Sequence, residues 1–244
     1  MSSNAQATMT LKKHELCFDA KAVIIDLDGT MLDTAAEIAA SANAMLQEFG
    51  LPPLTEQVLT DFVGKGAASL VERALVASIS KDSNQRGKAL NLEQAMPVFL
   101  RHYDQINSTL AIAYPHLTEG LRLMRAKGLR LACVTNKPQA LAIELLRNFE
   151  LIEYFEFTLG GDQMLRKKPD AWPMTEACRR LGIQTHQAIA IGDSNNDALA
   201  ARAAGLPVFL VPYGYRSGQS IDEIDCDGVV SDLRDAASRL RLAG

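Results

Sequence analysis

The chain has 244 residues, of which 48% are hydrophobic and 22% charged, and its formal net charge is −4 at pH 7. This composition is typical of a globular protein, long enough for one large domain or a core that carries a smaller inserted domain. The slight acidic excess argues against a nucleic-acid partner, which requires a basic surplus, and no apolar run approaches the roughly 18 residues of a membrane span.

The N-terminal segment is polar and lacks the apolar stretch of a secretory signal, so we expect a flexible leader over residues 1–20. The four cysteines lie far apart and form no CxxC pair. This spacing disfavours a disulfide framework or a zinc site. Together these features predict a cytoplasmic protein.

The first predicted strand, 21–26 (KAVIID), is a short β-branched run that ends at a DGT turn, as a fully buried strand does. Similar runs recur later, separated by helix-like stretches. The predicted strands are 129–135, 156–159, 188–192 and 207–211, and the predicted helices are 117–127, 138–149, 171–181 and 195–204. This alternation predicts an α/β fold with a Rossmann-like, doubly wound parallel sheet.

One stretch interrupts the alternation. Residues 35–113 show only helical periodicity, in the segments 35–49, 55–63, 67–80 and 92–110. An ordinary crossover needs only a few residues and one helix. We therefore expect an inserted α-helical cap domain over residues 35–113, a core domain formed by 21–34 and 114–244, and a return hinge at 113–116.

Four polar motifs stand at or near the ends of predicted strands, the edge at which open α/β sheets bind ligands. The first, DLDGT, contains the carboxylates Asp26 and Asp28 directly after the first strand. Two carboxylates that approach one point need a cation or a proton between them, and Mg²⁺ prefers such oxygen ligands. An ordinary DG turn after a strand is the alternative.

The second and third motifs supply groups suited to an anion. Thr135 and Asn136 end a strand just before a helix, where a hydroxyl and free N–H groups form an anion cradle, although a threonine that only caps the helix is commoner. The loop RKKP offers Lys167 or Lys168 to neutralise a phosphoryl group. Its alternative is a solvated basic loop.

The fourth motif, GDSNND, follows the strand 188–192. Asp193 can complete a magnesium site, and Asp197 faces the same point if a helix has begun. Alternatively, Asp193 or Ser194 only caps that helix and Asp197 favours its dipole.

In this order and topology, DxDGT, TN, KKP and GDxxxD closely resemble the motifs of the haloacid dehalogenase superfamily of aspartate-nucleophile phosphatases. The segments LDTAAEIAAS (32–41), FVGKGAASLVERAL (62–75), YPHLTEGLRLMRAKG (114–128) and VTNKP (134–138) resemble phosphoglycolate phosphatases in particular, although sister families share much of this pattern. The chain departs from that pattern at Ile25, where Phe is common, at Ala171, where Pro is common, and at Lys65, where Asn is more usual.

The resemblance implies a role for each acidic residue of the core. Asp26 would attack phosphorus and form an aspartyl-phosphate. Asp28, protonated at first, would protonate the leaving oxygen and then activate water. Mg²⁺ would be held by Asp26, Asp193 and the backbone carbonyl of Asp28, while Asp197 would support these ligands from behind.

The resemblance also assigns the groups that bind substrate. Thr135 and the N–H of Asn136 would bind phosphoryl oxygens, and Lys168, rather than Lys167, would neutralise them and orient Asp26. In the cap, Lys65 and Gly66 would bind substrate, with Lys65 reaching a substrate carboxylate and glycine allowing close backbone approach. A solvated loop lysine is the alternative for Lys65.

The implied activity is Mg²⁺-dependent hydrolysis of a small phosphorylated metabolite, most like 2-phosphoglycolate, by a monomer or small homo-oligomer. Other readings within the superfamily are a sugar-phosphate phosphatase, a phosphomutase and a phosphonate hydrolase with a Schiff-base cap lysine. Asp28 argues against a metal-free dehalogenase, and the complete set of motifs argues against a non-catalytic scaffold.

Overall fold

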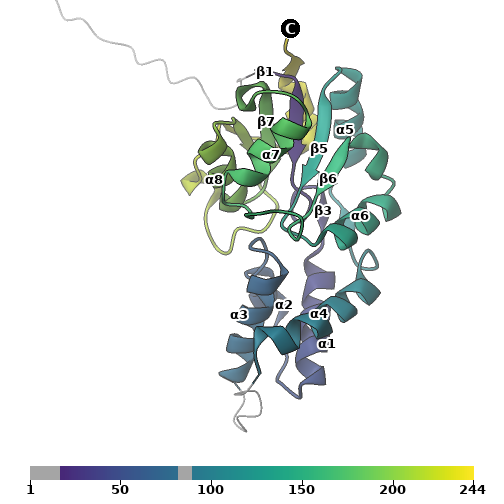
Figure 1. Cartoon of the computed structure of the whole chain (residues 1–244), viewed down its shortest axis with the longest axis vertical. Coiled ribbons are helices and arrows are strands. Elements are labelled where there is room, and N and C mark those ends of the chain that lie inside the picture. Colours follow the sequence, from purple (N-terminus) through teal and green to yellow (C-terminus); the bar gives the residue numbers. More distant parts are fainter. Residues whose placement is uncertain (1–16, 82–89) are drawn as a thin grey trace, which may run out of the picture.

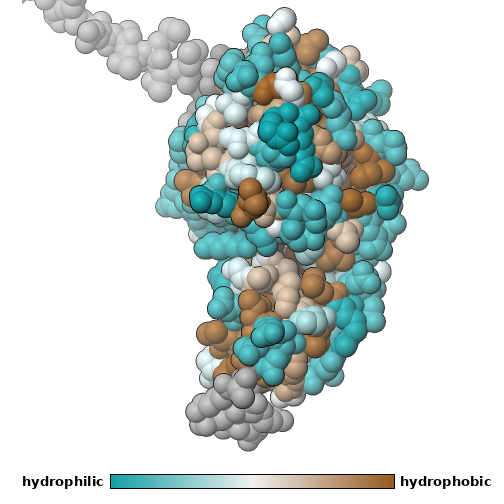
Figure 2. Space-filling model, viewed as in Figure 1, coloured by the Kyte–Doolittle hydropathy of each residue, from teal (hydrophilic) through white to brown (hydrophobic). Residues whose placement is uncertain are grey.

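The computed structural model describes residues 17–81 and 90–244. These residues form two lobes, a core built on a parallel sheet and a smaller lobe of helices, the cap (Figure 1). Hydrophilic and hydrophobic side chains are interspersed on the face of both lobes seen in Figure 2. Within the described residues, no helix combines the length and apolar character needed to span a bilayer. The predicted α/β core with a helical insertion is confirmed.

The core sheet has six parallel strands in the order β6-β5-β2-β7-β8-β9. The strand that precedes Asp26 therefore lies between the two strands that precede Thr135 and Asp193. The strands are β2 (Ala22–Ile25), β5 (Arg130–Val134), β6 (Phe157–Leu159), β7 (Ala188–Gly192), β8 (Val208–Leu210) and β9 (Gly228–Val229).

Successive residues of the central strand face opposite sides of the sheet, which explains its unbroken apolar sequence. Val23 and Ile25 pack in the hydrophobic cluster on one side, and Ala22 and Ile24 pack in the cluster on the other. The first cluster is covered by α5 (Leu117–Ala126), α6 (Gln139–Asn148) and α9 (Leu233–Ser238). The second is covered by α7 (Trp172–Arg180) and α8 (Asn195–Ala204). Three short 3₁₀ helices are η1 (Ile152–Tyr154), η2 (Thr185–Gln187) and η3 (Ile221–Glu223).

The predicted leader over residues 1–20 is wrong at its C-terminal end. β1 (Phe18–Ala20) pairs in parallel with β10 (Leu240–Leu242), and the Phe18 ring stacks edge-on against Phe209 at 5.3 Å. The first and last strands of the described residues are thereby joined to each other, and Phe18 packs on the core. The rest of the leader, residues 1–16, lies outside the described residues.

The described residues of the cap form four helices: α1 (Ala35–Glu48), α2 (Glu56–Thr60), α3 (Ala67–Ile79) and α4 (Leu92–Ile106). Their apolar faces enclose a separate hydrophobic cluster around Met45, Leu46, Val71 and Phe99. The described residues of 35–106 contain no strand. The helical insertion expected from periodicity is therefore a lobe with its own core.

The two connections between the lobes pair with each other. β3 (Leu32–Asp33) and β4 (Ile112–Ala113) form a short antiparallel ladder, so the hinge lies a little earlier than the 113–116 segment expected. The Tyr215 hydroxyl accepts hydrogen bonds from the N–H groups of Thr34 and Ala35, at 2.7 and 2.9 Å. It also donates to Asp33 Oδ1 at 2.5 Å. The core thus holds the start of the first cap helix.

Candidate active site

The carboxyl ends of the three central strands bring distant residues together. Asp26 follows β2, Thr135 follows β5 and Asp193 follows β7. β2 pairs with both of the other strands in parallel, so all three residues reach the same edge of the sheet. The cap lies over this edge (Figure 1).

Lys168 is a buried cation in direct contact with two of the predicted acidic residues. Its Nζ lies 2.8 Å from Asp26 Oδ1 and 2.6 Å from Asp197 Oδ1, and it donates to the Val134 carbonyl at 3.1 Å. Only 2% of its side chain is exposed. Lys167, the alternative, lies instead beside Gly66 of the cap. The loop RKKP therefore turns Lys168 inward.

Asp197 bonds to the start of α8 through one oxygen and to Lys168 through the other. Its Oδ2 accepts hydrogen bonds from the backbone N–H and the hydroxyl of Ser194, at 3.2 and 2.6 Å, and so closes a capping box at the start of α8. Its other oxygen faces Lys168. Burial would raise the pKa of Asp197, but the Lys168 ammonium and the Ser194 donors outweigh burial and lower it. Asp197 is therefore a fixed anion.

The other two core carboxylates are costly to ionise in the bare protein. Burial is the largest cause that raises the pKa of Asp26 to about 7, although the Lys168 charge opposes this shift. Burial, followed by the charges of Asp197 and Asp26, raises the pKa of Asp193 well above its usual range. A cation bound between Asp26 and Asp193 would reverse both effects.

The carboxylates fit a metal ion in geometry as well as charge. Asp26, Asp193 and Asp197 each place one oxygen within 4.8 Å of the others. Asp193 is held rigidly, because its Oδ1 accepts from the Thr30 hydroxyl at 2.9 Å and its Oδ2 from the Tyr215 N–H at 2.6 Å. Lys168 contacts Asp26 as well as Asp197, but both oxygens of Asp197 are already engaged, one by Lys168 and the other by Ser194.

Asn136 connects the phosphate-cradle motif to the cap. Its side-chain amide donates to the Gly64 carbonyl at 2.8 Å and to the Lys168 carbonyl at 2.9 Å, and its Oδ1 accepts from the Lys168 N–H at 3.1 Å. The cap turn comes close here, since a Cβ on Gly66 would lie 3.3 Å from the Asn136 carbonyl. Glycine at this turn, with φ of +85°, permits that approach.

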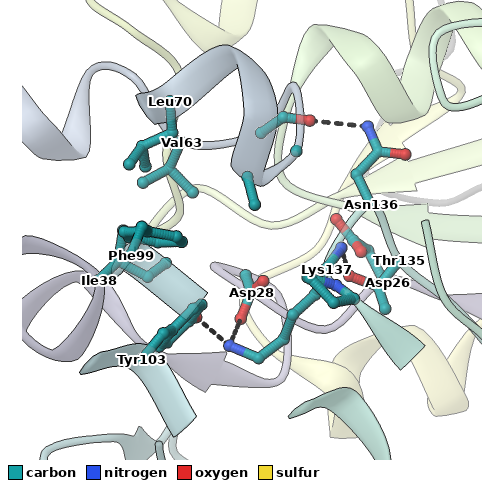
Figure 3. A pocket seen from close by; sticks show the side chains of 14 residues that line it. Asp26, Asp28, Ile38, Val63, Leu70, Phe99, Tyr103, Thr135, Asn136 and Lys137 are labelled. Atoms are coloured by element: carbon teal, nitrogen blue, oxygen red, sulfur yellow. Dashed lines mark hydrogen bonds and ion pairs between the residues drawn. The ribbon is translucent and has the colours of Figure 1, made fainter. Parts of the chain in front are cut away.

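A cavity lies between the edge of the sheet and the cap, and it contains Asp26 and Asp28 (Figure 3). Gly66 lines this cavity, but Lys65 does not. Lys65 is exposed and lines a neighbouring cavity together with Arg73 and Arg216. In this arrangement of the cap, Lys65 therefore lies outside the cavity that contains Asp26 and Asp28.

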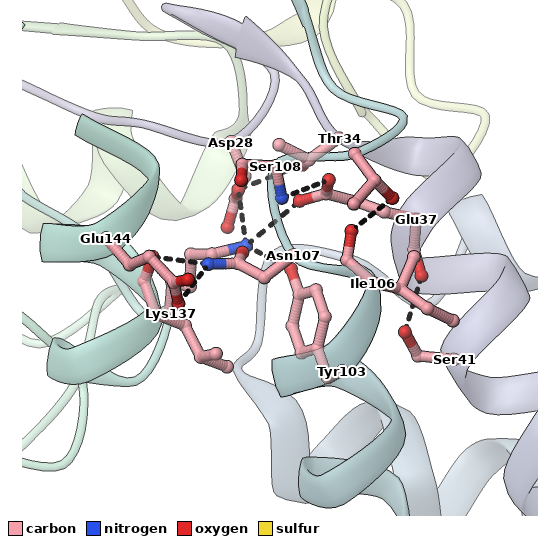
Figure 4. A network of polar contacts seen from close by, with 12 residues as sticks. Asp28, Thr34, Glu37, Ser41, Tyr103, Ile106, Asn107, Ser108, Lys137 and Glu144 are labelled. Carbon is pink, nitrogen blue, oxygen red and sulfur yellow. Dashed lines mark hydrogen bonds and ion pairs between the residues drawn. The ribbon is translucent and has the colours of Figure 1, made fainter. Parts of the chain in front are cut away.

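Sequence reasoning missed a second buried lysine, Lys137. Its Nζ lies 3.4 Å from Asp28 Oδ1 and 3.7 Å from Glu37 Oε1, and it forms a hydrogen bond with the Tyr103 hydroxyl (Figure 4). Asp28 also accepts from the Thr34 hydroxyl at 2.9 Å. The available signal was the position of this lysine, directly after the Thr-Asn pair at the same strand end.

The site therefore brings together the Asp26 carboxylate, the buried Lys168, the Thr135–Asn136 pair and a group of carboxylates that could hold a metal ion. A model of the haloacid dehalogenase-like hydrolases matches residues 23–211. A phosphoglycolate phosphatase of Nitrosospira multiformis is 45% identical over 221 residues, which are 91% of this chain and 96% of that protein. One of Thiobacillus denitrificans is 40% identical and covers 89% of this chain and 94% of its own length.

Solved structures agree with this assignment. The crystal structure of a predicted phosphoglycolate phosphatase from Haemophilus somnus matches with a TM-score of 0.82 and 29% identity, over 90% of this chain and 97% of that one. The match includes cap and core, since it spans nearly the whole of both chains. The four motifs, the fold and these relatives lead to one conclusion: the chain belongs to the haloacid dehalogenase-like hydrolase family.

Proposed function

We propose that this protein is a phosphatase that hydrolyses 2-phosphoglycolate through an aspartyl-phosphate on Asp26, with Mg²⁺ as its metal ion. The observation that carries the proposal is the Asp26 carboxylate, which opens into a cap-covered cavity and lies 2.8 Å from a buried lysine. The relatives named phosphoglycolate phosphatase support the choice of substrate.

Asp26, Asp193 and the backbone carbonyl of Asp28 would hold the metal ion. These are all oxygen ligands, and hard oxygen sites favour Mg²⁺ over softer metals. When bound, the ion would offset the repulsion between a carboxylate and a phosphate dianion, about 4 kcal/mol per charge pair at 4 Å and an effective dielectric of 20. The raised pKa values of Asp26 and Asp193 are consistent with a pair that is built to share a cation.

In the first step the Asp26 carboxylate attacks phosphorus. A bond forms between the carboxylate oxygen and phosphorus, and the bond from phosphorus to the ester oxygen breaks. Thr135 and the N–H of Asn136 bind the phosphoryl oxygens at the start of α6. Lys168 orients Asp26 and neutralises developing charge, while Asp197 holds the lysine in place through the 2.6 Å contact.

Asp28 moves the protons. It protonates the departing ester oxygen, so that glycolate leaves as an alcohol, and then takes a proton from the water that attacks the aspartyl-phosphate. That attack breaks the bond between phosphorus and Asp26 and releases inorganic phosphate. The Thr34 hydroxyl, 2.9 Å from Asp28 Oδ1, fixes the carboxyl from the hinge. The general acid is thus held by a residue next to the cap.

The cap keeps bulk water away from the aspartyl-phosphate. Its contribution to the cavity is apolar, and the Gly64 carbonyl is bonded to Asn136 across the junction. A small substrate suits such a closed site, whereas a sugar phosphate would need the cap to move away. We therefore favour 2-phosphoglycolate over the larger esters.

A panel of small phosphomonoesters, assayed for released phosphate with and without Mg²⁺, tests the proposal. We expect 2-phosphoglycolate to give the highest kcat/KM and activity to require the metal. A sugar phosphate that outperforms it would reassign the substrate. Return of the phosphoryl group to a sugar would indicate a mutase, and borohydride inactivation in the presence of a phosphonate would indicate Schiff-base chemistry.

A further inference from the structure

The cavity at the junction of core and cap has one polar and one apolar wall (Figure 3). The apolar wall comes from the cap and includes Ile38, Val63, Leu70 and Phe99. The polar wall comes from the core and includes Asp26, Asp28, Thr135, Asn136 and Lys137. Among the described residues that line this cavity, Lys137 is the only one with a positive charge. An anionic tail on the substrate has no other cation to meet there.

Lys137 is a buried ammonium that is only partly satisfied. Just 1% of its side chain is exposed, and its three donors face the Tyr103 hydroxyl, Asp28 at 3.4 Å and Glu37 at 3.7 Å. The contact with Glu37 is longer than a hydrogen bond, and Glu37 Oε1 has no hydrogen-bond partner. A better-placed carboxylate can therefore compete for this ammonium.

We propose that Lys137 binds the carboxylate of the substrate and thereby selects 2-phosphoglycolate. The inference rests on the proposed function, in which Asp28 protonates the ester oxygen. Lys137 is in contact with Asp28, so it lies next to the place that the ester oxygen occupies. In 2-phosphoglycolate a single methylene separates that oxygen from the carboxylate carbon. When the phosphoryl group of 2-phosphoglycolate lies against Asp26 and Thr135, the carboxylate of the same substrate is therefore directed to Lys137.

Glu37 acts as the internal anion of this subsite. It belongs to α1 of the cap, is fully buried, and accepts a hydrogen bond from the Ser108 N–H at 2.9 Å through Oε2. Its free oxygen balances the charge of Lys137 when no substrate is bound, and the substrate carboxylate takes that place on binding. Burial raises the pKa of Glu37, and the charge of Lys137 opposes this shift.

The test compares two substrates that differ only in the tail. Ethyl phosphate has a methyl group where 2-phosphoglycolate has a carboxylate, so the ratio of their kcat/KM values measures recognition of the tail alone. We expect Lys137→Met to lower this ratio by about 10- to 100-fold, the range of a lost charged hydrogen bond. Most of the loss should appear in KM, and Lys137→Arg should restore part of the ratio.

Lys65→Met serves as the rival variant, because Lys65 is the cap lysine outside this cavity. If Lys65→Met lowers the ratio and Lys137→Met does not, the carboxylate is bound by the cap turn and our inference is wrong. An unchanged ratio in Lys137→Met overturns it as well. Circular dichroism and urea unfolding of each variant separate a lost contact from a lost fold.

Removal of Lys137 leaves Glu37 buried without a cation, and the variant can fail to fold for that reason. Glu37→Gln provides a second test, since Gln keeps the acceptor for the Ser108 N–H but no longer competes for the ammonium. We expect it to raise the selectivity ratio at least about threefold, because one competing charge is gone. No rise in a folded Glu37→Gln variant contradicts the subsite.

Failure of this inference is distinguishable from failure of the proposed function. If the wild-type protein does not prefer 2-phosphoglycolate to ethyl phosphate, the proposed substrate is wrong. If the wild-type preference is present but survives Lys137→Met, the substrate stands and only the assignment of Lys137 falls.

Discussion

Asp26 is a partly buried carboxylate, and its neighbouring cation is Lys168. Asp26→Asn preserves the shape of the side chain and removes its nucleophilic charge. We expect phosphatase activity to fall at least about 1,000-fold while the far-UV circular dichroism stays that of the wild type. Asp104→Asn is the matched control, because Asp104 is exposed and has no part in the proposed site. Activity within about tenfold of wild type would exclude the covalent mechanism.

The same residue makes stability depend on pH in the metal-free protein. Burial, opposed by Lys168, raises the pKa of Asp26 to about 7, whereas an unfolded aspartate titrates near 4. Between these values the folded state keeps a proton that the unfolded chain has released, so the free energy of unfolding falls as pH rises through this window. The proton linkage therefore opposes folding at neutral pH.

We expect Asp26→Asn to flatten this decline. In EDTA, urea unfolding from pH 4 to pH 8 should show a drop that is smaller in the variant, by on the order of 1–3 kcal/mol. Asp104→Asn should follow the wild-type curve. Parallel curves for Asp26→Asn and wild type would mean that Asp26 titrates normally in the fold.

Sequence alone led to most residues of the site but not to Lys137. Asp26, Thr135 and Asp193 directly follow strands of one parallel sheet, so their meeting at one edge could be predicted from the chain order. Two partners of Lys137, Glu37 and Tyr103, come instead from cap helices. Their meeting depends on how the cap docks, which no local pattern encodes.

At the level of elements, the apolar strands at the centre of the core sheet were predictable, and the short two-stranded ladders outside it were not. β2 and β5 are buried on both faces, and their apolar runs are visible without knowledge of the fold. β1, β3, β4 and β10 have only two or three residues each, and they exist because a partner lies beside them. The return hinge expected at 113–116 overlaps β4 only at Ala113.

Tyr215 holds the connection between β3 and α1 through its hydroxyl. Its hydroxyl accepts from the N–H groups of Thr34 and Ala35, at the start of α1, and bonds to Asp33. Tyr215→Phe leaves the Thr34 N–H without this acceptor, so we expect a loss of about 1–3 kcal/mol in the free energy of unfolding. Urea denaturation measures it.

Tyr213→Phe is the control for the hinge prediction. This tyrosine also loses only a hydroxyl, and that hydroxyl makes a single hydrogen bond, 3.2 Å long, to the Thr30 carbonyl. We expect it to cost clearly less than Tyr215→Phe. Equal losses in the two variants would show that the Tyr215 hydroxyl does not hold the cap connection.

For the whole molecule, a metal ion bound at these carboxylates would link catalysis to stability. Asp26 and Asp193 are both disfavoured as anions in the bare protein, and an ion that binds only the folded state stabilises it by mass action. We expect EDTA to abolish activity and to lower the unfolding temperature. Mg²⁺ should restore both, while Ca²⁺ should not restore activity, because it does not enforce octahedral geometry. Full turnover in excess EDTA would contradict a metal-dependent reaction.

The strand order has a consequence for how the protein is made. β2, which leads to Asp26, leaves the ribosome early, but its neighbours β5 and β7 begin only at Arg130 and Ala188. The cap helices, by contrast, belong to one intervening stretch and pack on each other. We expect the cap helices to pack together first. The apolar strand β2 then remains without its two neighbours until β5, and later β7, has been synthesised. A chain that terminates before β7 would carry every residue of the cap and no working site.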